Sequence, residues 1–190
     1  MWCLVPVPLD INRVHLTLNF MQSGLHSDVC EIDYKLHNII SGRKRGVIQT
    51  IQEETATNIY FPTPLTGIIS PRDPALLSKQ NLIFITGEFF GVQRARDMLF
   101  QVSMHKSKCI ISRDTAMLPR KLDWLLSDKL EEAKAIMHDN GTFVNFPMIG
   151  SQASLISVYG DHRVNIERTL RAIMSLVSLI LFASDWITSY

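Results

Sequence analysis

The residues in this chain that are best suited to chemistry are five consecutive ones, Gly42-Arg43-Lys44-Arg45-Gly46. Glycines at both ends allow the backbone to turn tightly and to come close to a ligand, and the three cations between them attract phosphate. A helical pattern over residues 47–55 follows, and the first turn of such a helix offers free N–H groups and the positive end of its dipole. The segment therefore predicts a loop that holds a phosphate backbone.

A glycine loop of this kind, preceded by the apolar pair Ile39-Ile40, resembles that of the KH (K-homology) RNA-binding domain. In that family an apolar-Ile-Gly-x-x-Gly loop joins two short helices and clamps a few nucleotides of a single strand. The order of the elements resembles the eukaryotic type, type I, which implies an α+β fold with a three-stranded antiparallel sheet packed against three helices. Residues 29–33, 58–62 and 82–87 fit the family's strands, and residues 36–41, 47–55 and 92–104 fit its helices.

The loop departs from the family pattern at the second glycine. The second helix has the family's Ile-x-x-Ile-x-x-x-Thr ending, and counting back from Thr55 places Gly42 at the first glycine and Arg45 at the second. The glycine is displaced to Gly46, so the loop reads Gly-x-x-x-Gly, and Ser41 occupies a position that is apolar in the family. This form resembles the variant loops of Bicaudal-C-like and fungal multi-KH proteins, which can be one residue longer.

The resemblance also implies where RNA would bind. The loop would hold the sugar-phosphate backbone, and an apolar groove between the first two helices and the second strand would receive about four bases. Ile59 and Tyr60 are neighbours on a strand and point to opposite faces of the sheet, so only one of them can line the groove, and we choose Ile59. The predicted RNA-binding residues are Ile40, Gly42, Arg43, Lys44, Arg45, Gly46, Val47 and Ile59.

The chain also repeats itself. Residues of the first copy recur 85 positions later, namely Ile51, Thr57, Phe61 and Pro62 as Ile136, Thr142, Phe146 and Pro147. Residues 82–88 recur as residues 155–161, and a helical pattern with two arginines follows each copy. Self-similarity at this spacing predicts a duplicated unit. Equivalent residues are closer in number after residues 62–81 than before them, because this proline-rich loop of the first copy is longer than its counterpart in the second.

The second copy has lost the basic loop. Residues 127–131, Ser-Asp-Lys-Leu-Glu, stand where the first copy has residues 42–46; they contain no glycine, and their formal charge is −1 instead of +3. Carboxylates at this place repel phosphate. We expect a helix that begins with Ser127 as its cap and has an acidic first turn, followed by a turn at Asn140-Gly141. The second copy is therefore predicted to be structural, packed against the first, or to serve as an interaction surface.

These patterns divide the chain into four parts. Residues 1–26 form an N-terminal extension in which residues 14–20 alternate and predict an additional strand. Residues 27–106 form the first KH-like domain, residues 107–180 the degenerate second one, and residues 181–190 a C-terminal tail. Residues 172–183 are strongly apolar but shorter than the roughly 20 residues of a membrane span, so they predict a buried helix.

Composition excludes several classes of protein. The three cysteines are odd in number and widely spaced, which excludes a disulfide-rich scaffold and indicates a reducing compartment, the cytoplasm or the nucleus. Neither the cysteines nor the six histidines have the spacing of metal ligands, and no nucleotide-binding loop or nucleophile elbow is present. We therefore predict a protein that is not an enzyme and has no metal and no cofactor. The net charge of +1 carries no information, because the cations cluster locally.

The sequence thus predicts an RNA-binding protein of post-transcriptional regulation, in which the first domain binds single-stranded RNA. Two other functions stay open. A protein-interaction scaffold built on degenerate KH folds is favoured by the second copy and by the displaced glycine. A membrane-tethered adaptor is favoured only by the apolar C-terminal helix, so a membrane is the least expected partner.

Overall fold

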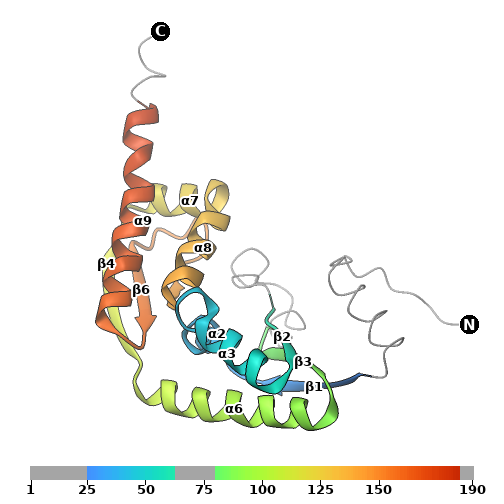
Figure 1. Cartoon of the computed structure of the whole chain (residues 1–190). Helices are drawn as coiled ribbons and strands as arrows, with labels where there is room; N and C mark the ends of the chain where they lie inside the picture. The colour runs from blue at the N-terminus through green and yellow to red at the C-terminus, as the bar shows by residue number, and fades with distance from the viewer. Residues whose placement is uncertain (1–24, 63–79, 185–190) are drawn as a thin grey trace, which may run out of the picture.

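The computed structural model describes residues 25–62 and 80–184 of the chain. Within these residues two units with the same order of elements follow one another (Figure 1). The first comprises β1 (His26–Glu31), α2 (Tyr34–Ser41), the 3₁₀ turn η1 (Arg43–Arg45), α3 (Gly46–Thr55), β2 (Thr57–Tyr60), β3 (Leu82–Gly87) and α6 (Phe89–Lys108). The second comprises β4 (Ile111–Ala116), α7 (Pro119–Asp128), α8 (Leu130–Asn140), β5 (Phe143–Asn145), β6 (Leu155–Gly160) and α9 (Arg163–Ser184).

Each unit contains one three-stranded antiparallel sheet. The strand orders are β1-β3-β2 and β4-β6-β5, so the last strand of each unit lies at the centre of its sheet. Along β3, Ile83 and Ile85 alternate with less buried residues and pack into the first core, as the period of two in a strand requires. The predicted α+β class, with two such sheets that each pack against three helices, is confirmed.

The two units are copies in three dimensions as well as in sequence. In the first sheet His26 lies opposite Gly87, and in the second sheet Ile111 lies opposite Gly160. These pairs preserve the offsets of the repeat, which confirms that the repeat is one duplicated structural unit. The predicted strand at residues 14–20 and most of the long loop after Pro62 lie outside the described residues.

In the second copy, the helix expected to begin at Ser127 begins later in the chain. Ser127 does not cap it, because Ser127 belongs to the last turn of α7, where its hydroxyl donates to the carbonyl of Asp123. Helix α8 begins at Leu130 after the single residue Lys129, and its first turn is acidic, as predicted. A one-residue junction between two helices leaves no loop that could surround a phosphate.

Helix α2 belongs to two hydrophobic cores at once. Ile40 is 0% exposed and packs in the core of the first unit, whereas Ile39 is 1% exposed and packs in the core of the second. Consecutive side chains point about 100° apart around a helix, so α2 can present one isoleucine to each core. The second unit therefore packs against the first, as the sequence predicted, and α2 is the element that they share.

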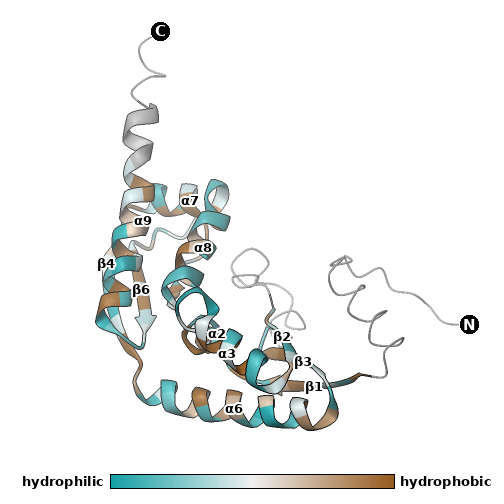
Figure 2. Cartoon of the chain, viewed as in Figure 1, coloured by the Kyte–Doolittle hydropathy of each residue, from teal (hydrophilic) through white to brown (hydrophobic). Residues whose placement is uncertain are grey.

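Close contacts around the end of α8 fix this arrangement. The Asn38 side-chain amide donates to the carbonyl of Thr142 at 3.1 Å, and the rings of Tyr34 and Phe143 meet edge to face at 5.6 Å. Gly141, which ends α8 with a left-handed φ of 62°, lies directly against the turn at Gly42. Figure 1 shows α8 beside α2 and α3, and Figure 2 shows that the ribbon where these segments meet is largely hydrophilic.

Among the helices of the described residues, we find none with the length and hydrophobicity that crossing a membrane requires. Helix α9 is long, and Ile166, Ile173 and Val177 of this helix are buried in the second core.

His37 is a buried histidine on the shared helix α2. Its Nε2 atom lies 2.8 Å from the carbonyl oxygen of Ile32, to which the ring donates its proton. Burial lowers the pKa of the His37 imidazole below its ordinary value of 6.5, and this effect outweighs the hydrogen bond to Ile32 and the charge of Asp33, which both favour protonation. Above pH 6.5 the folded chain therefore keeps His37 mainly neutral.

Replacing Gly141 by alanine tests the contact between the units. The added methyl group would lie 2.9 Å from the carbonyl carbon of Gly42 and 3.0 Å from the nitrogen of Arg43, which are backbone atoms. The left-handed conformation alone costs an alanine about 1 kcal/mol, and Ala56 adopts it at the equivalent end of α3. We expect Gly141→Ala to lower the free energy of unfolding, measured by urea denaturation, by about 2 to 4 kcal/mol.

Gly150→Ala is the matched control for this variant. Gly150 also has a left-handed φ, 78°, but its added methyl group has no neighbour within 4 Å. This variant should therefore lose only about 1 kcal/mol. Equal losses in the two variants would show that the contact of Gly141 with the loop does not stabilise the fold.

The lowered pKa of His37 makes stability depend on pH. The stabilisation is complete above 6.5, the value in the unfolded chain, and is lost as the pH falls from there toward the folded-state pKa. The free energy of unfolding should fall by at most about 1.4 kcal/mol per pH unit from this one group. His37→Gln keeps a donor for Ile32 but does not titrate, so urea titrations between pH 7.5 and 5.5 should show a shallower decline in this variant. Parallel pH profiles of the two proteins would contradict the assignment.

Candidate nucleic-acid interface

Gly42 makes the tight turn between α2 and α3. Its φ of 70° and ψ of 178° lie in a region that is essentially restricted to glycine. A methyl group at this position would also lie 2.9 Å from Cγ2 of Val47. No other residue type allows the chain to leave α2 in this direction, so the structure gives Gly42 the turning role that the sequence predicted.

The two residues before α3 carry the left-handed backbone of the loop. Lys44 (φ 50°) and Arg45 (φ 60°) are two of the three non-glycine residues with positive φ in the part of the chain that the structure describes. Each such residue costs about 1 to 2 kcal/mol. Gly46, in contrast, has ordinary helical angles and begins α3. The expectation that Gly46 serves as a second turning point is therefore wrong, because the left-handed residue at the second glycine position is Arg45.

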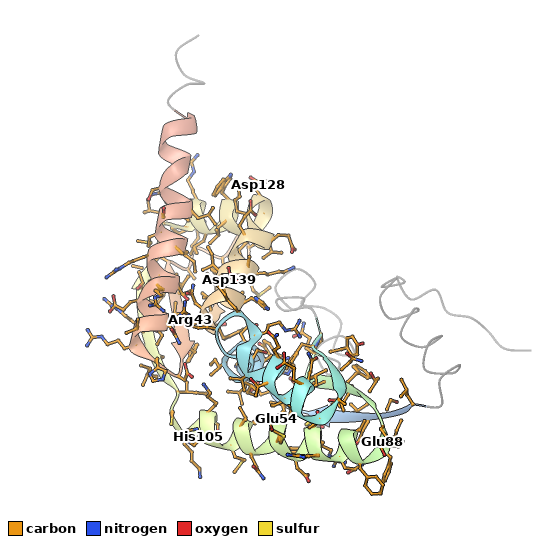
Figure 3. All side chains as sticks on the ribbon, viewed as in Figure 1. Arg43, Glu54, Glu88, His105, Asp128 and Asp139 are labelled. Carbon is orange, nitrogen blue, oxygen red and sulfur yellow. The ribbon has the colours of Figure 1, made fainter. Side chains whose placement is uncertain are left out.

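The loop presents its cations to solvent. Arg43, Lys44 and Arg45 are all exposed, and within the described ranges none of them forms an ion pair. The guanidinium of Arg45 lies 5.5 Å from the centroid of the Phe61 ring, a distance at which a cation is attracted to an aromatic face. Figure 3 shows Arg43 beside the end of α8 where Asp139 lies. The loop thus keeps its positive charge available next to the second unit.

Lys44 and Arg45 line a cleft of about 1000 Å³ to which both units contribute. This volume lies at the upper end of the range for ordinary ligand sites. The first unit also contributes Tyr34, His37, Asn38, Ser41, Ile48, Gln49, Gln52, Glu53, Asn58, Ile59, Tyr60, Phe61, Pro62 and Gln80. The second unit contributes Glu131, Lys134, Ala135, His138 and Phe143.

The side of the cleft along β2 offers polar groups over a strand in which buried and more exposed residues alternate. The backbone N–H of Ile59 donates to Oε1 of Gln52 at 2.8 Å. This N–H therefore points toward α3 and away from the partner strand β3. Ile59 itself is 3% exposed and packs in the first core. The Nε2 atom of Gln80 is buried and, within the described residues, has no hydrogen-bond partner. Because this atom is buried, it could pair with a ligand only if the Gln80 side chain turned toward the cleft.

The predicted groove residues divide into those that the cleft includes and those that it does not. Ile40 is fully buried between α2 and the first sheet, so its assignment to the groove is corrected. Val47 is partly buried, packs against the first core and is not part of the cleft lining. Ile59 and Tyr60 both border the cleft, so the expectation that only one of them could line it is wrong. Ile59, the residue that we chose, exposes only 3% of its surface.

Sequence reasoning missed the wall from the second unit. Glu131, Lys134, Ala135 and His138 are spaced as one face of α8, and this spacing was the only available signal. A mixed polar face of this kind is typical of an ordinary solvated helix. The sequence gives no indication that this face lies opposite a basic loop from the other unit.

Comparison with known proteins identifies both units. Residues 24–109 match the family model described as the KHD4 second KH domain, and residues 112–180 match the model of the Mug60/KHD4 KH type I domain. The chain is also 65% identical over 171 residues to K homology domain-containing protein 4 of Mycosarcoma maydis. This match covers 87% of the chain and 12% of that relative, so the chain spans a small part of the relative's length.

Two solved structures show weaker similarity. The 13th KH type I domain of human Vigilin has a TM-score of 0.36 and 21% identity over 57% of this chain and 93% of that domain. A chain in the a/eIF2alpha-aDim2p-rRNA complex of Pyrococcus horikoshii OT3 has a TM-score of 0.34 and 15% identity over 84% and 89% of the two chains. The element order, the two sheets and the two family matches agree with one another. The chain belongs to the KH family, and its two units are KH-type domains in tandem.

Proposed function

We propose that this chain binds single-stranded RNA in the cleft, with residues 42–46 on the sugar-phosphate backbone. The left-handed cationic residues Lys44 and Arg45 carry this proposal. Strained backbone persists mainly where a ligand site needs it, and here it coincides with unpaired positive charge beside a cleft. Membership of the KH family supports nucleic-acid binding in general.

The lining of the cleft favours single strands over duplexes. Aromatic rings such as those of Tyr34, Tyr60 and Phe61 can stack on bases, and the side-chain amides of Gln49 and Asn58 can form hydrogen bonds with base edges. These contacts require bases that have left the helical stack. A duplex exposes mainly phosphates and sugars, which would leave the aromatic and amide groups without partners.

We place this activity in post-transcriptional regulation in a reducing compartment, the cytoplasm or the nucleus. Among the described residues Cys30 and Cys109 are free thiols. Burial raises the pKa of the Cys30 thiol to about 11, so this thiol stays protonated and unreactive at neutral pH. Both observations suit a protein that does not depend on disulfides.

One observation favours protein interaction as a second function. Phe89 and Phe90, at the start of α6, are exposed, and their ring centroids lie 5.4 Å apart. The ring of Phe89 also contacts that of His26 at 5.0 Å. None of these residues lines the cleft, so a protein partner on this apolar surface would not displace RNA from the cleft.

Reversing the two cations of the loop tests RNA binding. Lys44→Asp with Arg45→Asp puts repulsion where phosphate would lie, and aspartate tolerates the left-handed backbone better than most residues. We expect the affinity for a labelled single-stranded RNA, measured by fluorescence anisotropy, to fall at least about 30-fold. The melting temperature should remain close to that of the native chain, because both side chains are exposed.

The double variant Arg120→Asp with Lys121→Asp is the matched control. It makes the same change in net charge at two adjacent cations in the first turn of α7, and neither residue lines the cleft. Its RNA affinity should change little. If both double variants lost affinity to the same extent, total charge rather than the loop would determine binding, and the assignment of the site would be wrong.

A further inference from the structure

Helix α8 faces the cleft with one continuous stripe of side chains. Glu131, Lys134, Ala135 and His138 follow one another at intervals of three and four residues, and all four line the cleft. The opposite side of the helix carries Ala133 and Met137, which are buried in the second core. This stripe of α8 therefore borders the same cleft as Lys44 and Arg45, while Glu131 and Ala135 within it remain exposed to solvent.

Lys134 is the cation at the centre of this stripe. Its side chain is only 14% exposed, and its ammonium group pairs with Oε1 of Glu131 at 2.7 Å. Glu131, in contrast, is 81% exposed at its side chain. Packing thus holds the stem of Lys134 in the wall, while the carboxylate that neutralises it can move away into solvent.

The docking of the two units fixes the distance between this wall and the loop. The end of α8 at Gly141 rests on the backbone of Gly42 and Arg43, and Thr142 accepts a hydrogen bond from Asn38. Figure 3 shows Asp139 near Arg43 and Asp128 at the far end of α7 and α8, so α8 extends away from the loop. A strand that leaves the loop along the cleft would pass the cleft-facing stripe of α8.

We propose that the second unit supplies the second wall of the RNA site and that Lys134 binds a phosphate of the RNA. In the absence of RNA, Glu131 pairs with Lys134 instead. This inference rests on the proposed binding of RNA in the cleft. A phosphate that reaches this wall replaces Glu131 as the anionic partner of Lys134, and the Glu131 side chain turns toward solvent. The second unit thereby contacts RNA through a helix face, although it has no glycine loop.

The helix contains an internal control for this proposal. Lys129 and Glu132 form a second ion pair with the same spacing of three residues and the same distance of 2.7 Å. Neither residue lines the cleft. Substitutions in the two pairs therefore change the net charge around the first turns of α8 by the same amount, but only one pair borders the cleft.

We would measure the affinity of the full chain for a labelled, sequence-randomised single-stranded RNA pool at several salt concentrations. Glu131→Gln should bind about threefold or more tightly, because it frees Lys134 and removes a negative charge from the cleft. Lys134→Gln should bind about fivefold more weakly, and the slope of log affinity against log salt should become shallower by about 0.7. Glu132→Gln and Lys129→Gln should leave both quantities unchanged.

Lys134→Arg serves as the folding control, because it keeps the charge and the long apolar stem and should keep the salt slope. Equal effects in the cleft pair and the control pair, or an unchanged slope in a folded Lys134→Gln chain, would overturn the two-wall site. In that case a loss of binding on reversal of Lys44 and Arg45 would still support RNA binding by the first unit. If that reversal also had no effect, RNA binding in the cleft would itself be wrong.

Discussion

The approach of two glycine backbones, Gly42 and Gly141, is the constraint on which the rest of the structure depends. A methyl group at Gly141 would lie 2.9 Å from the carbonyl carbon of Gly42, well inside van der Waals contact. Gly42 itself excludes a side chain through its φ of 70° and through Cγ2 of Val47, which would lie 2.9 Å from an added methyl group. Their contact lets α8 lie along the first unit, which closes the cleft. The negative end of the α8 dipole then faces a loop with three cations. Arg43, whose backbone lies against Gly141, is the cation of this loop that is placed to favour docking of the second unit.

Because both units share α2, the second unit packs against the first although it has no glycine loop. Ile39 is buried in the second core although it belongs to the first unit, and burial of such a side chain contributes roughly 1.5 to 3 kcal/mol. Separation of the units would expose Ile39 and break the contact of Tyr34 with Phe143. The second unit thus stabilises the helix from which the loop emerges, and this role does not require a loop of its own.

The sequence predicted the elements and the loop well, because periodic patterns and special residues encode them locally. Gly42 needs its conformation whatever surrounds it, and the resemblance to the KH pattern placed Ile51 and Thr55 on one helix. Burial was harder to assign, since Ile39 and Ile40 are equally apolar and only the docked second unit decides which core each one enters. The second wall of the cleft could not be predicted, because periodicity shows which face of α8 is polar but not what lies opposite that face.

The replacement of a glycine by Arg45 changes how the loop can hold phosphate. A glycine at this position would let the backbone itself approach the ligand, whereas Arg45 adopts the same left-handed conformation and adds a guanidinium that lies over Phe61. In the proposed RNA site, recognition would therefore shift from backbone N–H groups to charged side chains, which release counterions when they bind phosphate, so affinity would depend more steeply on salt. Such contacts are less exact in geometry than backbone contacts. In the proposed site, a cleft whose second wall is fixed through Gly141 would compensate for this, because it would restrict the positions that an RNA strand can take between the two units.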